Sequence, residues 1–184
     1  PVLLRMGETA ANGENALVVA VRSGHLAFAK LLLERGADPN ADEAGYAPLH
    51  LAILRGEPEL VKLLLTHHSN PSQKVRKGTP SRRLHYQWDV SWDLVGVTPF
   101  FQAAQYLEVE IMQALAAAGA DTNFRTAEGN TPLMAVTGAG GLAPDTISDR
   151  RGFNLGAEVR EVERLDEDRV IEGVKVMLGL GAKV

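Results

Sequence analysis

A five-residue segment recurs along the chain, and its spacing limits the folds that the sequence can form. Residues 36–40 are Gly-Ala-Asp-Pro-Asn, residues 119–123 are Gly-Ala-Asp-Thr-Asn, and a divergent copy lies at residues 68–72. An apolar run precedes each copy, and Gly181 and Ala182 repeat the start of the segment near the end of the chain. Self-similarity of this kind indicates a repeat architecture, in which equivalent units stack in series.

Prolines and glycines indicate where the helices of each unit begin and end. A turn glycine opens each unit; the first two are 32 residues apart and the last two are 33 residues apart (Gly13, Gly45, Gly96 and Gly129). Proline follows the turn in three units, where its fixed φ and missing N–H suit the start of a helix (Pro48, Pro99 and Pro132). Gly36 and Gly119 follow the second apolar run, where a left-handed cap favours glycine. Each unit is therefore predicted to form two short helices joined by a turn.

The repeat length, together with the prolines and glycines at the helix boundaries, resembles the ankyrin-repeat family, whose period is about 33 residues. The resemblance covers residues 13–72, 96–141 and 166–184. It implies an all-α fold, an ankyrin-repeat solenoid of about four helix-turn-helix repeats with β-finger loops. One helix pair cannot bury its apolar stripe alone, so neighbouring repeats must stack.

The Thr-Pro-Leu-His start that is usual in the family is never complete in this chain. Ala47 accompanies His50, and Thr98 accompanies Phe101. The departure affects the family's Thr–His hydrogen bond but leaves the stacking of repeats intact. His25 and His50 lie where ankyrin repeats ordinarily carry histidine, so the resemblance implies a structural role for both.

The markers divide the chain into repeats and insertions. Residues 1–12 are predicted to be the tail of a preceding repeat, because the apolar residues at 2–4 resemble the end of a second helix. The predicted repeats and insertions are 13–41, 42–72, a finger insertion at 73–95, 96–124, and 125–184 with an insertion at about 142–165. Because neither end carries a polar cap, we expect the chain to be part of a longer array.

The finger insertion, residues 73–95, is the most individual part of the sequence. It begins with a basic stretch that contains no acidic residue: Lys74, Arg76, Lys77, Arg82 and Arg83. Apolar and aromatic residues then alternate with polar ones, and both tryptophans of the protein lie in this part (Leu84, Tyr86, Trp88, Val90 and Trp92). Strict alternation predicts an extended strand or arm. In the ankyrin layout, such a finger borders the concave groove.

Two interpretations of the finger remain open. Tyr, Trp and Arg are the residues enriched in the energetic centres of protein interfaces, so the finger is a candidate binding site for a protein partner (Arg82, Arg83, Tyr86, Trp88 and Trp92). Alternatively, the aromatic face packs back on the protein's own helices, because an aromatic strand left in water promotes aggregation. Both interpretations can hold for different residues.

The second insertion is rich in glycine at its start and acidic at its end. Loops of this length are either functional or simply solvated, and we favour a solvated loop here. The inserts, together with the motifs at residues 78–83 and 97–101, are similar to those of long bacterial ankyrin arrays. That similarity leaves the compartment open: exported or periplasmic in a longer bacterial chain, otherwise cytoplasmic.

No motif for catalysis, for a cofactor or for a metal ion is apparent in the sequence. The chain has no cysteine, and it contains neither a phosphate-binding loop nor a nucleophile elbow. His67, His68 and His85 lack the spacing of a metal site. No apolar run is long enough to span a bilayer. We therefore expect no enzymatic activity, no cofactor and no membrane span.

These observations favour a protein-protein interaction module that binds a partner through the concave groove and the finger. A structural alternative is a solenoid that self-associates head to tail through uncapped ends. A third possibility is an anion or nucleic-acid contact through residues 74–83, although the net charge of −4 disfavours nucleic acid as a partner.

Overall fold

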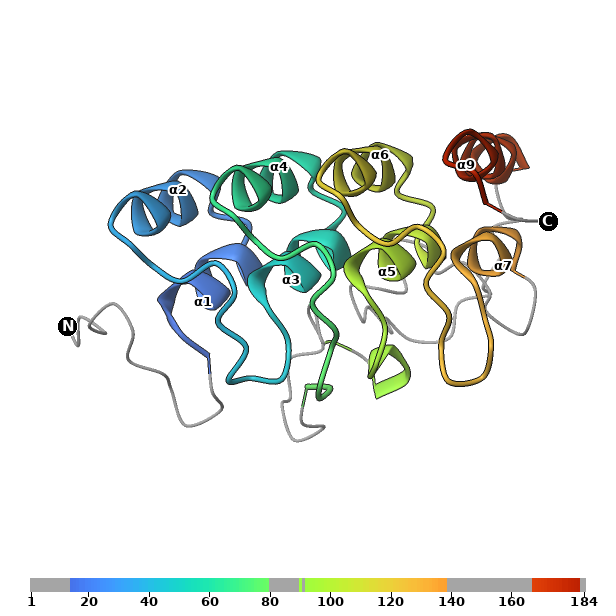
Figure 1. The fold of residues 1–184 in the computed structure, drawn as a ribbon. Helices are drawn as coiled ribbons and strands as arrows, with labels where there is room; N and C mark the ends of the chain where they lie inside the picture. The colour runs from blue at the N-terminus through green and yellow to red at the C-terminus, as the bar shows by residue number, and fades with distance from the viewer. Residues whose placement is uncertain (1–13, 80–89, 91, 139–166, 183–184) are drawn as a thin grey trace, which may run out of the picture.

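The computed structural model describes residues 14–79, 90, 92–138 and 167–182, and these residues form a series of helix pairs. The pairs are α1 (Ala16–Arg22) with α2 (Leu26–Glu34), α3 (Pro48–Arg55) with α4 (Pro58–Thr66), α5 (Pro99–Gln105) with α6 (Val109–Ala117), and α7 (Pro132–Thr137) with α9 (Glu167–Gly179). A short 3₁₀ helix, η1 (Trp92–Leu94), precedes α5. Figure 1 shows the pairs as two parallel rows, with the connecting loops on one side of the array.

Local sequence rules account for the ends of the helices. Asn15, Thr98 and Thr131 each accept a hydrogen bond from a backbone N–H in the first turn of α1, α5 and α7, so these caps satisfy donors that the helix leaves free. Gly56 and Gly138 end α3 and α7 in the left-handed conformation, which glycine adopts without strain. The prolines and the glycines that the sequence assigned to helix boundaries thus lie at helix boundaries.

Stacking of equivalent helices generates one continuous core. The first helices contact one another in the order α1, α3, α5, α7, and the second helices α4, α6 and α9 follow in the same way. The core side chains are mostly leucine, alanine and valine, and the small alanine side chains allow neighbouring helices to approach closely. No strand occurs among the described residues. The predicted all-α solenoid of helix-turn-helix repeats is therefore confirmed.

Arginine side chains connect neighbouring repeats at the ends of the first helices. Arg55 donates a hydrogen bond of 2.8 Å to the carbonyl of Arg22, which ends α1 in the preceding repeat. Arg169 on α9 donates one of 3.0 Å to the carbonyl of Leu107, just beyond α5. The last carbonyls of a helix lack partners within the helix, and a cationic donor stabilises them.

Candidate functional site

Hydrogen bonds join the two ends of the finger insertion at two points, an inner pair next to the helices and an outer pair farther along. We call the joined residues the stem (residues 74–79, 90 and 92–97). At the inner pair, the N–H of Val75 donates to the carbonyl of Val97 at 3.1 Å, and the N–H of Gly96 donates to the carbonyl of Val75 at 2.7 Å. At the outer pair, the N–H of Thr79 donates to the carbonyl of Val90 at 2.9 Å. The N–H of Val90 in turn donates to the Thr79 hydroxyl, also at 2.9 Å. The chain therefore leaves the array and returns to it at nearly the same place.

A close backbone approach attaches the stem to the second repeat. The carbonyl of Gly45 accepts hydrogen bonds from the N–H groups of Arg76 and Lys77, at 2.7 and 3.1 Å. A Cβ atom at position 45 would lie only 2.3 Å from Cβ of Lys77. Gly45 also has a φ of +98°, a conformation that side chains rarely adopt. Only glycine fits this contact without displacing the stem.

Side chains of the stem join the core of the array. Val75, Val90 and Leu94 are buried and belong to the same apolar cluster as the helices. The hydroxyl of Thr79 is a partner of the buried Tyr46 phenol. Burial of three apolar side chains, each contributing on the order of 1.5–3 kcal/mol, holds the stem against the repeats.

A buried polar cluster lies beneath the stem and connects the first two repeats. The Tyr46 hydroxyl donates to the Glu14 carboxylate at 3.0 Å and accepts from Arg22, and Arg22 also pairs with Glu14. Burial raises the pKa of Tyr46 above its usual value, with the nearby Arg22 guanidinium acting in the opposite direction. A phenol whose pKa is raised remains neutral at physiological pH, so it can donate to Glu14 and accept from Arg22.

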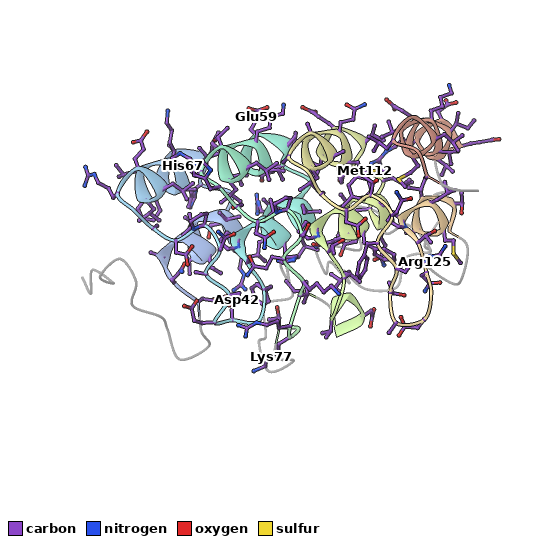
Figure 2. All side chains as sticks on the ribbon, viewed as in Figure 1. Asp42, Glu59, His67, Lys77, Met112 and Arg125 are labelled. Carbon is purple, nitrogen blue, oxygen red and sulfur yellow. The ribbon has the colours of Figure 1, made fainter. Side chains whose placement is uncertain are left out.

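Exposed cations of the basic stretch lie on the loop side of the array. Lys74, Arg76 and Lys77 are exposed, and Figure 2 shows Lys77 near Asp42 on this side, opposite the row that carries Glu59. Arg76 donates to the carboxylate and to the carbonyl of Asp42, each at 2.7 Å. The ammonium group of Lys74 lies 4.7 Å from the centroid of the Phe124 ring, in a cation–π arrangement with the following loop.

The predicted partner-binding residues lie mostly beyond the described part of the chain. Arg82, Arg83, Tyr86 and Trp88 fall outside the described residues. Trp92 begins η1, and its side chain is outside what the structure describes. The strand predicted from the alternation does not continue through Trp92, because residues 92–94 turn into a 3₁₀ helix that buries Leu94.

Val90, which alternates with the aromatic residues, has a buried side chain. The inward packing of the aromatic face itself stays a prediction, because those side chains lie outside what the structure describes. The sequence did not indicate Val75, Thr79 or Tyr46 as residues that position the finger. An apolar residue near each end of the insertion, Val75 just inside it and Val97 just after it, was the available signal for a closed base.

Two of the three histidines that were considered as metal ligands, His67 and His68, lie among the described residues. Among the described residues, no group of three or more His, Asp or Glu side chains could hold a metal ion. His85 lies outside those residues. Within the same described ranges, no helix combines the length and the apolar character that a bilayer crossing requires.

Stacked helix pairs with their loops gathered on one side define a helical repeat solenoid. A family model for ankyrin repeats in three copies matches residues 2–75. The chain belongs to the ankyrin-repeat family. Ankyrin repeats generally mediate protein–protein interaction, and the family is generally non-catalytic.

Several curated proteins are similar to the chain. It is 38% identical to the 2-5A-dependent ribonuclease of Mus musculus over 72 residues, which are 38% of this chain and 10% of that protein. It is 33% identical to SH3 and multiple ankyrin repeat domains protein 2 of Homo sapiens over 126 residues, which are 67% of this chain and 6% of the relative. Ankyrin repeat and SOCS box protein 6 of Homo sapiens is 28% identical over 171 residues, covering 90% of this chain and 36% of its own length.

The chain thus spans from 6% to 36% of the length of these three relatives. The similarity lies in the repeats that the proteins share. The similarity to bacterial arrays therefore remains a prediction.

Proposed function

We propose that this chain is a non-catalytic interaction module that binds a protein partner through the finger insertion and the adjoining groove. The observation that carries the proposal is the fixed stem. A binding loop is most effective when a rigid scaffold positions it, because less conformational entropy is then lost on binding.

The composition of the loop supports a protein as the ligand. Residues 80–89 carry Arg82, Arg83, Tyr86 and Trp88, and Trp92 follows within the stem. Aromatic and arginine side chains dominate the energetic centres of protein interfaces. Lys74 and Lys77 on the stem are exposed cations and favour a partner with acidic groups.

The test is affinity capture with quantitative mass spectrometry, using three forms of the chain. The first is the unaltered chain, the second has residues 80–89 replaced by a Gly/Ser segment of equal length, and the third carries Gln113→Ala on the exposed side of α6. We expect at least one protein to be captured by the unaltered and Gln113→Ala forms and lost from the loop replacement.

Purified binding of that protein to single variants then identifies the contacts. Arg82→Ala, Arg83→Ala, Tyr86→Ala, Trp88→Ala and Trp92→Ala should each weaken binding while the melting temperature stays within a few degrees of the unaltered chain. Capture of the same proteins by all three forms would contradict the proposal. A large fall in melting temperature for each aromatic variant would show instead that these side chains belong to the core.

A further inference from the structure

The outer pair of the stem, Thr79 and Val90, adjoins the part of the insertion that carries the candidate contacts. Thr79 comes directly before residues 80–89 and Val90 directly after them. The two residues share two hydrogen bonds, both of 2.9 Å, and they are 5% and 1% exposed. The closure of this pair therefore fixes the points at which the chain enters and leaves residues 80–89.

The inner and outer parts of the stem are attached to the second repeat by different contacts. Near the inner pair, the backbone N–H groups of Arg76 and Lys77 donate to the carbonyl of Gly45, at 2.7 and 3.1 Å. At the outer pair, the hydroxyl of Thr79 donates to the phenol of Tyr46. Gly45 and Tyr46 are consecutive, so one short segment of the second repeat contacts the stem at both levels. Only the outer contact depends on a side-chain hydroxyl of the repeat.

The charged groups beside Tyr46 fix the direction of each hydrogen bond. A carboxylate can only accept, so the phenol hydrogen goes to Glu14, at 3.0 Å. A guanidinium can only donate, so the phenol oxygen accepts from Arg22, and it accepts from Thr79 as well. The one hydrogen of the Thr79 hydroxyl is then used on Tyr46, and the Thr79 oxygen is left to accept the N–H of Val90. A directed series of hydrogen bonds thus runs from the first repeat to the outer pair.

We propose that Tyr46 is a positioning residue for the finger insertion, because its hydroxyl holds Thr79 and keeps the outer pair closed. Tyr46 is only 2% exposed, so it offers almost no surface to a partner and acts through Thr79. Loss of the phenol hydroxyl leaves the buried Thr79 hydroxyl without its acceptor, which favours opening of the outer pair. The importance of Tyr46 for binding rests on the proposed function, whereas its effect on the outer pair is a property of the free protein.

Amide hydrogen exchange, followed by NMR for each residue of the full chain, tests the proposal. We expect Tyr46→Phe to raise the exchange rates of Thr79 and Val90 at least about fivefold more than those of Val75 and Gly96 in the inner pair. A merely structural role of the hydroxyl would raise all four rates by a common factor, because all four amides would then exchange through general unfolding. Equal acceleration in both pairs, or acceleration in neither, would overturn the proposal.

The matched control is Tyr106→Phe, which removes another buried phenol hydroxyl. Tyr106 is 3% exposed and follows the last residue of α5, at the end of that helix away from the stem. This variant should change the ratio of outer to inner exchange rates by less than about twofold. A change as large as that of Tyr46→Phe would overturn the proposal, because loss of any buried hydroxyl would then open the outer pair.

Substitutions of Thr79 test the same contact from the other side and leave the cluster around Tyr46 in place. Thr79→Val removes the hydroxyl and should raise the exchange rates at positions 79 and 90, whereas Thr79→Ser keeps the hydroxyl and should preserve slow exchange. Unchanged exchange in Thr79→Val, or equal acceleration in Thr79→Ser, would overturn the proposal even if Tyr46→Phe does not fold.

Because these measurements use the free protein, their failure would leave the capture of a partner by residues 80–89 unaffected. With the captured partner, Tyr46→Phe should weaken binding at least about threefold relative to Tyr106→Phe, since a less fixed loop loses more conformational entropy on binding. Equal affinities of the two variants would overturn the role of Tyr46 in positioning the finger insertion for binding.

Discussion

The second and third repeats fill the same position of the fold with different chemistry. In the second repeat, buried His50 accepts a hydrogen bond from the N–H of Ala47 at 3.0 Å and donates to the carbonyl of Gln73 at 2.9 Å. In the third repeat the equivalent residue is Phe101, whose ring meets Phe124 edge to face at 6.2 Å. Each side chain thus contacts the loop that follows its repeat, by hydrogen bonds in one case and by aromatic packing in the other.

The exchange also changes how the first helix is capped. Ala47 has no side-chain acceptor, and the His50 ring instead bonds to the N–H of this cap residue. In the third repeat, the hydroxyl of Thr98 caps the helix by accepting from the N–H of Phe101, at 3.4 Å. We call the contact between the His50 or Phe101 side chain and the following loop the joint of its repeat. The stacked fold requires that the joint is filled and that its polar groups are hydrogen-bonded, but it does not require one particular pair of residues. The comparison also predicts that the two joints respond differently to substitution and to pH.

The largest expected effect on stability comes from removing the contact between Phe101 and Phe124. Phe101→Ala removes a fully buried ring and leaves Phe124 without its aromatic partner, so it should lower the free energy of unfolding by about 3–5 kcal/mol in urea titrations. The control Leu178→Ala, at an exposed position, should change it by less than about 0.5 kcal/mol. A loss below about 1 kcal/mol for Phe101→Ala would show that the third joint does not depend on the ring.

The second largest expected effect is a pH dependence of stability that arises from His50 in the second repeat and has no counterpart at Phe101 in the third. Burial lowers the pKa of His50 from 6.5 to about 4, so the unfolded chain binds its proton more readily than the folded one. The contribution of neutral, buried His50 to the free energy of unfolding is fully present above pH 6.5. This contribution is lost as the pH falls from 6.5 to about 4, and below pH 4 the loss grows no further. The linked loss is on the order of 3 kcal/mol.

Urea titrations between pH 4 and pH 7 measure this dependence. His50→Gln is the matched variant, because an amide offers an acceptor and a donor without titrating in this range. The pH dependence of the unaltered chain should exceed that of His50→Gln by the amount given above. Equal slopes for the two proteins would mean that His50 is protonated as easily in the folded state as in the unfolded chain.

The smallest effect concerns the cation above the aromatic joint. Lys74→Met keeps an unbranched side chain over Phe124 but removes the charge, so the free energy of unfolding should fall by about 0.5–1 kcal/mol. Lys77→Met, an exposed neighbour, should have no measurable effect. The same change in the free energy of unfolding for both variants would show that the charge of Lys74 does not stabilise the contact between Phe101 and Phe124.

Much of the fold was predictable because the signals are local. Pro48 and Gly36 act through their own backbone preferences, and the apolar stripes act through neighbours three and four residues away. Such signals are visible in any short window of the sequence. Repetition then strengthens them, since the same markers return in each unit.

The attachment of the finger was not predictable in the same way. The contact of Gly45 with Lys77 and the cluster around Tyr46 join residues about 30 positions apart, and no local pattern specifies them. The 3₁₀ turn at Trp92–Leu94 overrides an alternation that predicted a strand, because Leu94 gains burial in the core. The assignment of Arg82, Arg83, Tyr86 and Trp88 to a binding site remains a prediction.

The hydrogen bonds between Val75 and residues 96–97 have an evolutionary consequence. Because the two ends of the excursion meet at one point, its length is independent of the geometry with which the third repeat stacks on the second. Doubling the number of residues between such ends costs only about 0.6 kcal/mol of closure entropy. Descendants of this sequence can therefore lengthen, shorten or exchange the segment and acquire new ligands while the supporting helices keep their arrangement.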